Sequence, residues 1–313
     1  MQPYYEANKF LEMYQEPLFL LFVIHIIILT YIVGFMLIRN AKSGSRMVKS
    51  GTALVLLLSG PMLYTFERGN IILWIPFLCL AFIQFYDSEN RILKEIGIIC
   101  LAIAAGIKMT PAILGIILIV EKRWKEAFRA VIYGVVMFIG PFFLLKGGIS
   151  NISLMFRNLG ILMEKYADAE GCSIRNIFGT FEKLFGLQDT SVTIVSIVTI
   201  LVSVCLLLCA FFSKKKWEKV MALTLIFMTA PNYAGYYCLI YLIPSITLFL
   251  NDETHRISDI LILMSGLFIF NPVQSQLIQF GFDYHLGVVL SLVVLIYRGI
   301  SYSYGGIMKM RRS

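Results

Sequence analysis

Five polar motifs interrupt the apolar runs of this 313-residue sequence, and they contain most of the side chains that could bind a ligand. The motifs centre on Arg68, Lys108, Cys172, Asn232 and Asn271. Cations gathered in one cavity stabilise a bound phosphate and the negative charge that develops on a departing phosphate. Asparagine and tyrosine side chains can hydrogen-bond sugar hydroxyls. The motifs therefore predict a site for a ligand that contains both phosphate and sugar, provided that the fold brings them together.

The candidate substrate-binding residues come from four of these motifs. Lys108 lies between two apolar runs with no acid nearby in the sequence, and a charge at membrane depth usually faces a cavity or a partner. We therefore expect Lys108 to bind ligand rather than to extend to the membrane surface. The other candidates offer cationic, amide, hydroxyl or aromatic groups, namely Arg68, Asn70, Thr110, Arg175, Asn232, Tyr236 and Tyr237.

Ordinary structural explanations stay open for several of these residues. Glu67 and Arg68 can simply cap a turn at the water interface. Tyr236 and Tyr237 are also typical of aromatic side chains at a membrane interface, where no ligand is needed. Arg175 lies in a loop of mixed charge, where a solvated surface position explains it equally well.

The elements that must position these motifs are membrane helices. Hydrophobic residues make up 58% of the chain and charged residues only 15%, against about 45–50% and about 25% in soluble domains. This composition excludes a disordered chain, a secreted disulfide scaffold and an ordinary cytosolic enzyme. The sequence predicts an all-α, polytopic membrane protein with about 9–11 transmembrane helices.

The apolar runs differ in length. A spanning helix needs about 20 apolar residues, and runs 18–38 and 191–213 have this length. Shorter or interrupted runs, including 127–145 and 286–300, bring the total to about eleven. Breaks between short helices are tolerated at membrane depth where they are buried in protein or line a wet cavity. The breaks are therefore of more functional interest than the helices.

Charge predicts the orientation of the chain. The net charge is +8, from 27 basic and 19 acidic residues. If successive runs cross the membrane alternately, 19 of the 27 basic residues fall on one side, which the positive-inside rule makes cytoplasmic. We expect a plasma-membrane protein with its N-terminus extracytoplasmic and its C-terminus cytoplasmic, so that the basic excess reflects topology and not nucleic-acid binding. All five polar motifs then fall on the extracytoplasmic side.

This topology divides the chain into four parts. We expect an extracytoplasmic segment over 1–17, an N-terminal bundle over 18–145, an extracytoplasmic loop over 146–190, and a C-terminal bundle with a cytoplasmic tail over 191–313. The six cysteines include no pair with zinc-finger spacing, and no glycine-rich phosphate loop occurs. We expect no metal and no cofactor, with the lipid bilayer as a partner.

The order of three motifs resembles glycosyltransferase family 87. These motifs are residues 67–71 (ERGNI), 106–111 (GIKMTP) and 121–124 (EKRW). Residues 172–176 (CSIRN) are similar to the outer-loop serine motif of that family, and the segment from Thr229 to Pro244 is similar to its late proline-and-tyrosine segment. The resemblance covers about residues 14–250, and the 106–111 segment with Arg123 and Trp124 is its most specific part.

The resemblance implies a GT-C fold and a hexosyltransferase, mannosyltransferases included. It implies a polyprenyl-phosphate sugar as donor, an envelope glycan or glycolipid as acceptor, an extracytoplasmic active site, and a carboxylate that acts as general base on the acceptor hydroxyl. Family members usually begin with a further helix and a loop that carries the catalytic aspartate. We expect both to be missing here, because the chain is a truncated form, because its start is placed too late, or because another acid does the work. Glu67 and Glu16 are the expected catalytic substitutes.

Two other functions fit the same features. A transporter or flippase for lipid-linked sugars would also use broken helices and a lysine at membrane depth, but the sequence shows no internal repeat. A truncated, non-catalytic membrane subunit of polysaccharide assembly would explain the missing aspartate loop.

Overall fold

The structure, a computed structural model, describes residues 17, 20–21, 23–40, 45–165, 171–231, 234–252, 254–271 and 281–310. These residues form helices throughout, and the described part of the chain contains no β-strand beyond one isolated bridge between Gly171 and Gly235. The prediction of an all-α, membrane-type fold is confirmed.

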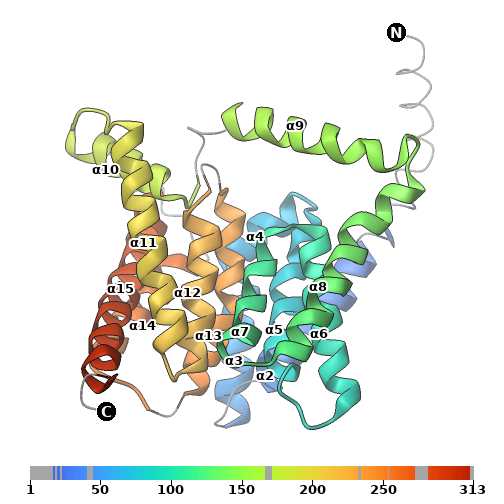
Figure 1. The fold of residues 1–313 in the computed structure, drawn as a ribbon, viewed down its shortest axis with the longest axis horizontal. Coiled ribbons are helices and arrows are strands. Elements are labelled where there is room, and N and C mark those ends of the chain that lie inside the picture. The colour runs from blue at the N-terminus through green and yellow to red at the C-terminus, as the bar shows by residue number, and fades with distance from the viewer. Residues whose placement is uncertain are drawn as a thin grey trace.

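The first half of the chain forms a compact series of helices (Figure 1). In chain order these are η1 (Ile26–Val33), α2 (Gly34–Asn40), α3 (Arg46–Leu57), α4 (Gly60–Glu67), η2 (Ile71–Trp74), α5 (Ile75–Phe85), α6 (Arg91–Ile107), η3 (Thr110–Gly115), α7 (Ile116–Val120), α8 (Trp124–Ile139) and η4 (Gly140–Leu144).

The second half adds two surface helices and a second group of bundle helices. In chain order these are η5 (Gly148–Ser150), α9 (Asn151–Lys165), α10 (Ile174–Phe185), α11 (Val192–Phe212), α12 (Lys216–Thr229), η6 (Tyr236–Leu242), α13 (Ile243–Asn251), α14 (Asp259–Ile269) and α15 (Phe282–Met310).

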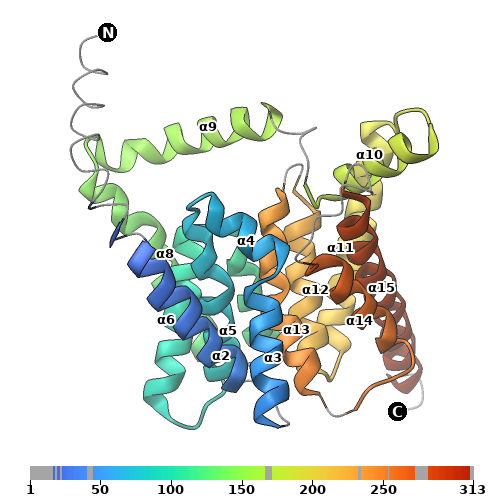
Figure 2. The ribbon, with the colours of Figure 1, turned by 180° about the vertical axis from the view of Figure 1, so that it is seen from behind.

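The two ends of the bundle differ. At the upper end of Figure 1, α9 lies across the bundle and α10 projects beyond it. The end of α15 and the connections α11–α12 and α13–α14 lie at the lower end, and Figure 2 shows the same division from behind.

Short 3-10 segments begin three of the bundle elements. The segments η2, η3 and η6 lead directly into α5, α7 and α13. Pro76, Pro111 and Pro244 lie in the first turns of α5, η3 and α13, where the missing N–H group of proline costs no helix hydrogen bond. Prolines therefore help to fix the starts of α5, η3 and α13.

Few helices are long enough to span a membrane alone. Among the described residues, the three that are cover Trp124–Leu144, Val192–Phe212 and Phe282–Tyr304, and the pair α3–α4, bent by 49°, passes the same test when it is taken as one broken span. Five further apolar helices have only 10–17 residues. The run expected at 286–300 begins earlier, at Phe282, and its helix continues to Met310. The expected start was too late because the polar side chain of His285 interrupts the hydropathy, whereas in the fold His285 is buried against the Gly171 carbonyl oxygen.

The described helices include both fully packed ones and apolar ones with exposed faces. Nearly every side chain of α12 from Trp217 to Thr229 is buried between neighbouring helices. No residue of α8 is buried, and Phe128 and Val131 expose 68% and 64% of their surface. Apolar helices with exposed apolar faces are expected where lipid, not water, is the surrounding solvent.

Candidate functional site

Lys108 ends α6 in an extended conformation and turns its ammonium toward η6. The Lys108 Nζ lies 3.5 Å from the Cys238 Sγ, 5.2 Å from the ring centre of Tyr237 and 5.5 Å from that of Tyr241. None of the ion pairs among the described residues includes Lys108. Cation–π contacts and a polarisable thiol hold this charge without neutralising it. The ammonium therefore remains suited to an anionic ligand.

Thr110 opens η3 two residues after Lys108. Its hydroxyl is buried and has no hydrogen-bond partner among the described residues. A buried hydroxyl normally has a hydrogen-bond partner. The Thr110 hydroxyl, like the Lys108 ammonium, is therefore available to bind a ligand at this break. The side chain of Tyr237, at the start of η6, covers the same break.

The segment before α10 docks on the segment before η6. The backbone N–H of Cys172 donates to the carbonyl oxygen of Ala234 at 2.6 Å, and Gly171 forms the isolated bridge to Gly235. The Cys172 thiol is fully buried and contacts the Ala234 carbonyl oxygen at 3.2 Å. We call these four backbone positions, 171–172 and 234–235, the seam. The seam joins two predicted motifs that lie 62 residues apart in sequence.

The serine motif forms the start of α10. The Ser173 hydroxyl accepts from the backbone N–H of Asn176, and the Asn176 side chain accepts from the backbone N–H of Ser173, so the two residues form a capping box. Such a box satisfies helix N-terminal donors and fixes the direction of the helix. Arg175 lies in this first turn, is partly exposed and lines the cavity described below.

A chain of ring contacts connects Arg68 to the seam. The Arg68 guanidinium lies 4.6 Å from the ring centre of Tyr64, and Tyr64 packs edge-on against Tyr236 at 5.3 Å. Tyr236 in turn contacts Tyr284 at 5.0 Å, and Tyr284 contacts His285 at 4.3 Å. Tyr236 is therefore a packed core residue, whereas Tyr237 faces the Lys108 ammonium.

The remaining residues of the first motif lie on the surface. Glu67 ends α4 and is exposed, and Arg68 follows it as an exposed C-cap. Gly69 has a φ of 57°, a left-handed conformation that glycine adopts without strain. Asn70 accepts a hydrogen bond from the backbone N–H of Ile72 and so caps η2. The turn at residues 67–70 is thus built by local structure, with the Glu67 carboxylate free to reach solvent.

Two predicted site residues lie outside the described residues. These are Glu16 and Asn232. Residues 272–276 of the fifth motif also lie outside them, although Asn271 is described and its carbonyl oxygen accepts from the backbone N–H of Gly60 at 3.2 Å. The structure therefore describes the other eight predicted site residues, which are Glu67, Arg68, Asn70, Lys108, Thr110, Arg175, Tyr236 and Tyr237.

A cavity of about 930 Å³ lies beside the seam, between α10 and α11. Arg175 and Asn176 line it from α10, Thr229 from the end of α12, and His285 from the start of α15. The sequence reasoning missed His285 and this cavity. An ionisable residue within the apolar helix 282–304 was the signal that could have found it.

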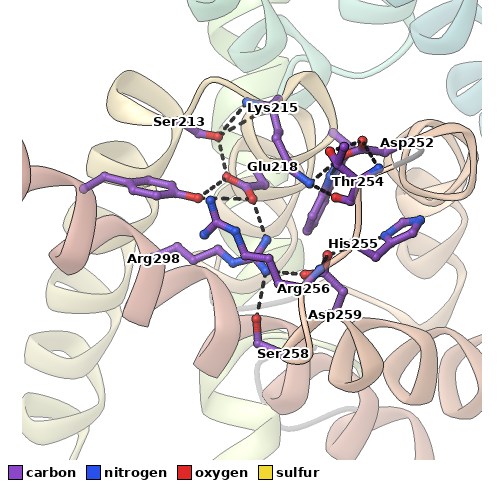
Figure 3. Close-up of polar contacts among 12 residues, drawn as sticks. Ser213, Lys215, Glu218, Asp252, Thr254, His255, Arg256, Ser258, Asp259 and Arg298 are labelled. Carbon is purple, nitrogen blue, oxygen red and sulfur yellow. Dashed lines mark hydrogen bonds and ion pairs between the residues drawn. The ribbon is translucent and has the colours of Figure 1, made fainter.

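The lower end carries a second polar group that the sequence reasoning also missed (Figure 3). Arg298 is buried, forms an ion pair with Glu218 at 2.5 Å and another with Asp259, and lies 5.2 Å from the ring centre of Trp217. The hydroxyl of Tyr302 donates to Glu218 at 3.1 Å. These buried charges are mutually satisfied and join α12, α14 and α15. We interpret them as structural.

The lysines after α11 also have partners at the lower end. Lys215 forms an ion pair with Asp252 at 2.8 Å, and Lys216 forms one with Asp87 at 2.9 Å. The residues 214–216 therefore help to fix the helix connections at this end, in addition to their expected contribution to topology.

The fold and the upper-end site together define a class of protein. The chain is an all-helical membrane protein that presents a lysine, tyrosines and a loop-borne arginine at one end of its bundle. A model of glycosyltransferase family 87 matches residues 10–240, which is well over half of the chain. The chain belongs to glycosyltransferase family 87 and is a glycosyltransferase, so the resemblance of its motifs is confirmed. It matches no curated protein and no solved structure.

Proposed function

We propose that the chain transfers a hexose, with mannose as the first candidate, from a polyprenyl-phosphate donor to an envelope glycan or glycolipid. Family membership supports the type of reaction. The observation that carries the choice of donor is the Lys108 ammonium, held over Tyr237 and Tyr241 without a carboxylate partner among the described residues. A cation in this state favours an anionic phosphate that reaches it from the bilayer.

The reaction takes place on the extracytoplasmic side of the plasma membrane. The upper end carries the proposed site, and the segments that the expected topology assigns to the opposite side carry 19 of the 27 basic residues. Because positive segments are retained in the cytoplasm, this distribution supports an extracytoplasmic upper end. Loop 146–190 then covers the site from outside through the seam.

The side chains divide the work of the transfer. Lys108 and Arg68 bind the donor phosphate, and Thr110 and Tyr237 contact the donor beside Lys108. The predicted ligands Asn70, Arg175, Asn232 and Tyr236 complete the pocket. Tyr236 acts through its packing against Tyr64 and not through a free hydroxyl face.

The chemical step is a displacement at the anomeric carbon. Glu67 or Glu16 accepts the proton of the acceptor hydroxyl, whose oxygen forms a bond to the anomeric carbon. The bond from that carbon to the phosphate oxygen breaks, and its electron pair leaves with the polyprenyl phosphate. The Lys108 ammonium stabilises the charge that develops on the leaving phosphate.

A transfer assay tests this function. Purified chain in lipid nanodiscs is incubated with radiolabelled polyprenyl-phosphate mannose and envelope glycolipids, and label in the acceptor is counted. We expect Lys108→Ala to lower transfer by about 10²-fold, as is typical when a group that stabilises transition-state charge is removed. Lys214→Ala is the matched control, because Lys214 is exposed in the connection between α11 and α12.

Normal transfer by Lys108→Ala would remove that residue from the mechanism. Label that crosses a vesicle membrane without entering the acceptor would favour a flippase instead. Glu67→Gln and Glu16→Gln, compared in the same assay, identify which carboxylate takes the proton, since only the catalytic one should abolish transfer while the other leaves it intact.

A further inference from the structure

The cavity between α10 and α11 has walls of two kinds. Five residues of α11 line it at helical spacing, Val192, Val195, Ser196, Thr199 and Ile200. They occupy one face of the helix, because residues three, four, seven and eight positions apart share a face. The wall is therefore apolar with two hydroxyls in its middle, which suits an amphipathic ligand that approaches from the bilayer.

The hydroxyls of this wall are available as acceptors. Ser196 donates to the Val192 carbonyl oxygen and Thr199 to the Val195 carbonyl oxygen, each at 2.8 Å. A hydroxyl has one donor hydrogen and two lone pairs. Both oxygens can therefore still accept hydrogen bonds from hydroxyl groups of a ligand.

The opposite wall carries balanced charge. Arg175 and Lys183 are matched by Glu182 and Asp189 among the lining residues. Glu182 also accepts a hydrogen bond from the backbone N–H of Thr190 at 2.7 Å. With two cations and two carboxylates, the described lining residues of this cavity carry no excess positive charge, unlike the surroundings of Lys108. It therefore favours a neutral polar ligand over a phosphate.

His285 lines the cavity with a defined tautomer. Its Nε2 lies 2.6 Å from the Gly171 carbonyl oxygen. A carbonyl oxygen only accepts, so Nε2 carries the hydrogen, and in the neutral ring Nδ1 is an acceptor. The His285 side chain is 98% buried, as its 2% exposed fraction shows, and no described residue donates to Nδ1. A buried acceptor of this kind normally has a donor.

We propose that this cavity binds the glycan of the acceptor, and that His285 Nδ1 accepts a hydrogen bond from one of its hydroxyls. The inference rests on the proposed function, because it names the second substrate of the same transferase. The seam lies between the two binding regions. Lys108 contacts Cys238, three residues after Gly235 of the seam, and the bridge partner of Gly235, Gly171, contacts His285. The donor phosphate would thus contact the Lys108 ammonium on one side of the seam, and the neutral sugar would contact hydroxyl groups and the His285 acceptor on the other.

Photoaffinity labelling tests the inference without any transfer. The probe is hexyl α-mannoside with a diazirine on its hexyl chain, applied to the chain in nanodiscs, and adducts are mapped by peptide mass spectrometry. We expect adducts within residues 175–200, suppressed by unmodified hexyl mannoside but not by undecaprenyl phosphate. Lys108→Ala should leave the labelling unchanged.

Three variants of the cavity sharpen this test. His285→Gln keeps an N–H donor for the Gly171 carbonyl but moves its only acceptor, the amide oxygen, away from the position of Nδ1, and should reduce labelling about fivefold or more. Thr199→Val removes a cavity hydroxyl and should reduce labelling in the same direction. Thr193→Val is the matched control, since Thr193 is exposed on the same helix and does not line the cavity.

Other outcomes would overturn the inference. These are adducts that map elsewhere, equal competition by undecaprenyl phosphate, or unchanged labelling in both Thr199→Val and a folded His285→Gln protein. If His285→Gln fails to fold, Thr199→Val against Thr193→Val decides the matter. Labelling at 175–200 in a chain that transfers no sugar would support the glycan site while contradicting the proposed reaction, so the two failures are distinguishable.

Discussion

The Lys108 ammonium lies 3.5 Å from the thiol of Cys238, a residue 130 positions later in the chain. This contact joins the break between α6 and η3 to the start of η6 (Figure 1). It also places the cation beside two tyrosine rings in a protein that belongs to a glycosyltransferase family. The contact explains why two weak motifs, read together, mark one site.

The ring of Tyr237 should contribute to anion binding through Lys108. Tyr237→Leu removes a ring face 5.2 Å from the ammonium, whereas Tyr237→Phe keeps it. A cation–π contact contributes about 0.5–2 kcal/mol, so we expect undecaprenyl phosphate to bind several-fold more weakly to the Leu variant and normally to the Phe variant. Equilibrium binding in nanodiscs measures this, and equal affinities for both variants would show that the ring does not position the cation.

The seam should depend on the absence of a side chain at residue 171. A Cβ at Gly171 would lie 2.5 Å from the Ala234 carbonyl oxygen and 2.8 Å from the Asn176 Oδ1, whereas a Cβ at Gly179 would meet nothing within 4 Å. Gly171→Ala must therefore displace backbone, and we expect faster proteolysis in loop 146–190 and loss of transfer. Gly179→Ala in α10 is the control and should be neutral or slightly stabilising. Equal protease resistance of the two variants would exclude a structural role for the seam.

The Arg298 cluster should be one of the main contributors to stability at the lower end. Arg298→Met leaves the buried carboxylates of Glu218 and Asp259 without their cation, and breaking a buried pair in this way costs about 3–5 kcal/mol. Lys94→Met is the comparison, because the Lys94–Glu126 pair is partly exposed at 3.9 Å and such pairs contribute about 0–1 kcal/mol. Thermal unfolding in detergent should show a much larger loss for Arg298→Met, and similar losses would contradict a structural role for the cluster.

Acid should weaken the connection between α13 and α14. Burial raises the pKa of Asp252, but hydrogen bonds from Lys215, Thr254 and Trp217 outweigh it and hold that pKa well below its usual value. A depressed carboxyl pKa stabilises the fold above the unfolded pKa, about 3.9, and this contribution is lost as pH falls further toward the folded pKa. When the pH is lowered below about 4, the unfolding temperature should therefore decrease. Asp252→Asn should be less stable at pH 7 and show a smaller acid loss, and an unchanged acid loss would assign it to other groups.

The orientation of the chain is testable by labelling from outside. Leu187 exposes 61% of its surface near the upper end, and Lys214 is exposed at the lower end. In intact cells, a membrane-impermeant maleimide should modify Leu187→Cys and not Lys214→Cys, because the positive segments stay in the cytoplasm. The parent chain gives the background from its own cysteines, four of which are buried. Reversed labelling would place the proposed site in the cytoplasm.

Much of the fold followed from the sequence because its physical causes are local. Apolar composition over long runs requires helices in a membrane, and prolines and asparagine caps such as Asn90 set many helix boundaries within one or two turns. The break at Lys108 was predictable for the same reason, since a lysine followed by Thr-Pro interrupts the hydrogen-bond pattern of α6. Motif order was enough to indicate the family, which the match over residues 10–240 confirms.

Contacts between distant segments were decided only by the tertiary structure. Nothing local in the sequence pairs Gly171 with His285, Cys172 with Ala234, or Arg298 with Glu218, because these contacts arise from helix packing across the bundle. The same packing hid the true start of α15, whose polar residues are stabilised by partners that hydropathy does not count. The sequence determined which groups lie at the helix breaks. Packing decided which of these groups face a charge, a ring or a cavity, because the burial of a side chain and the direction in which it points depend on neighbours far along the chain.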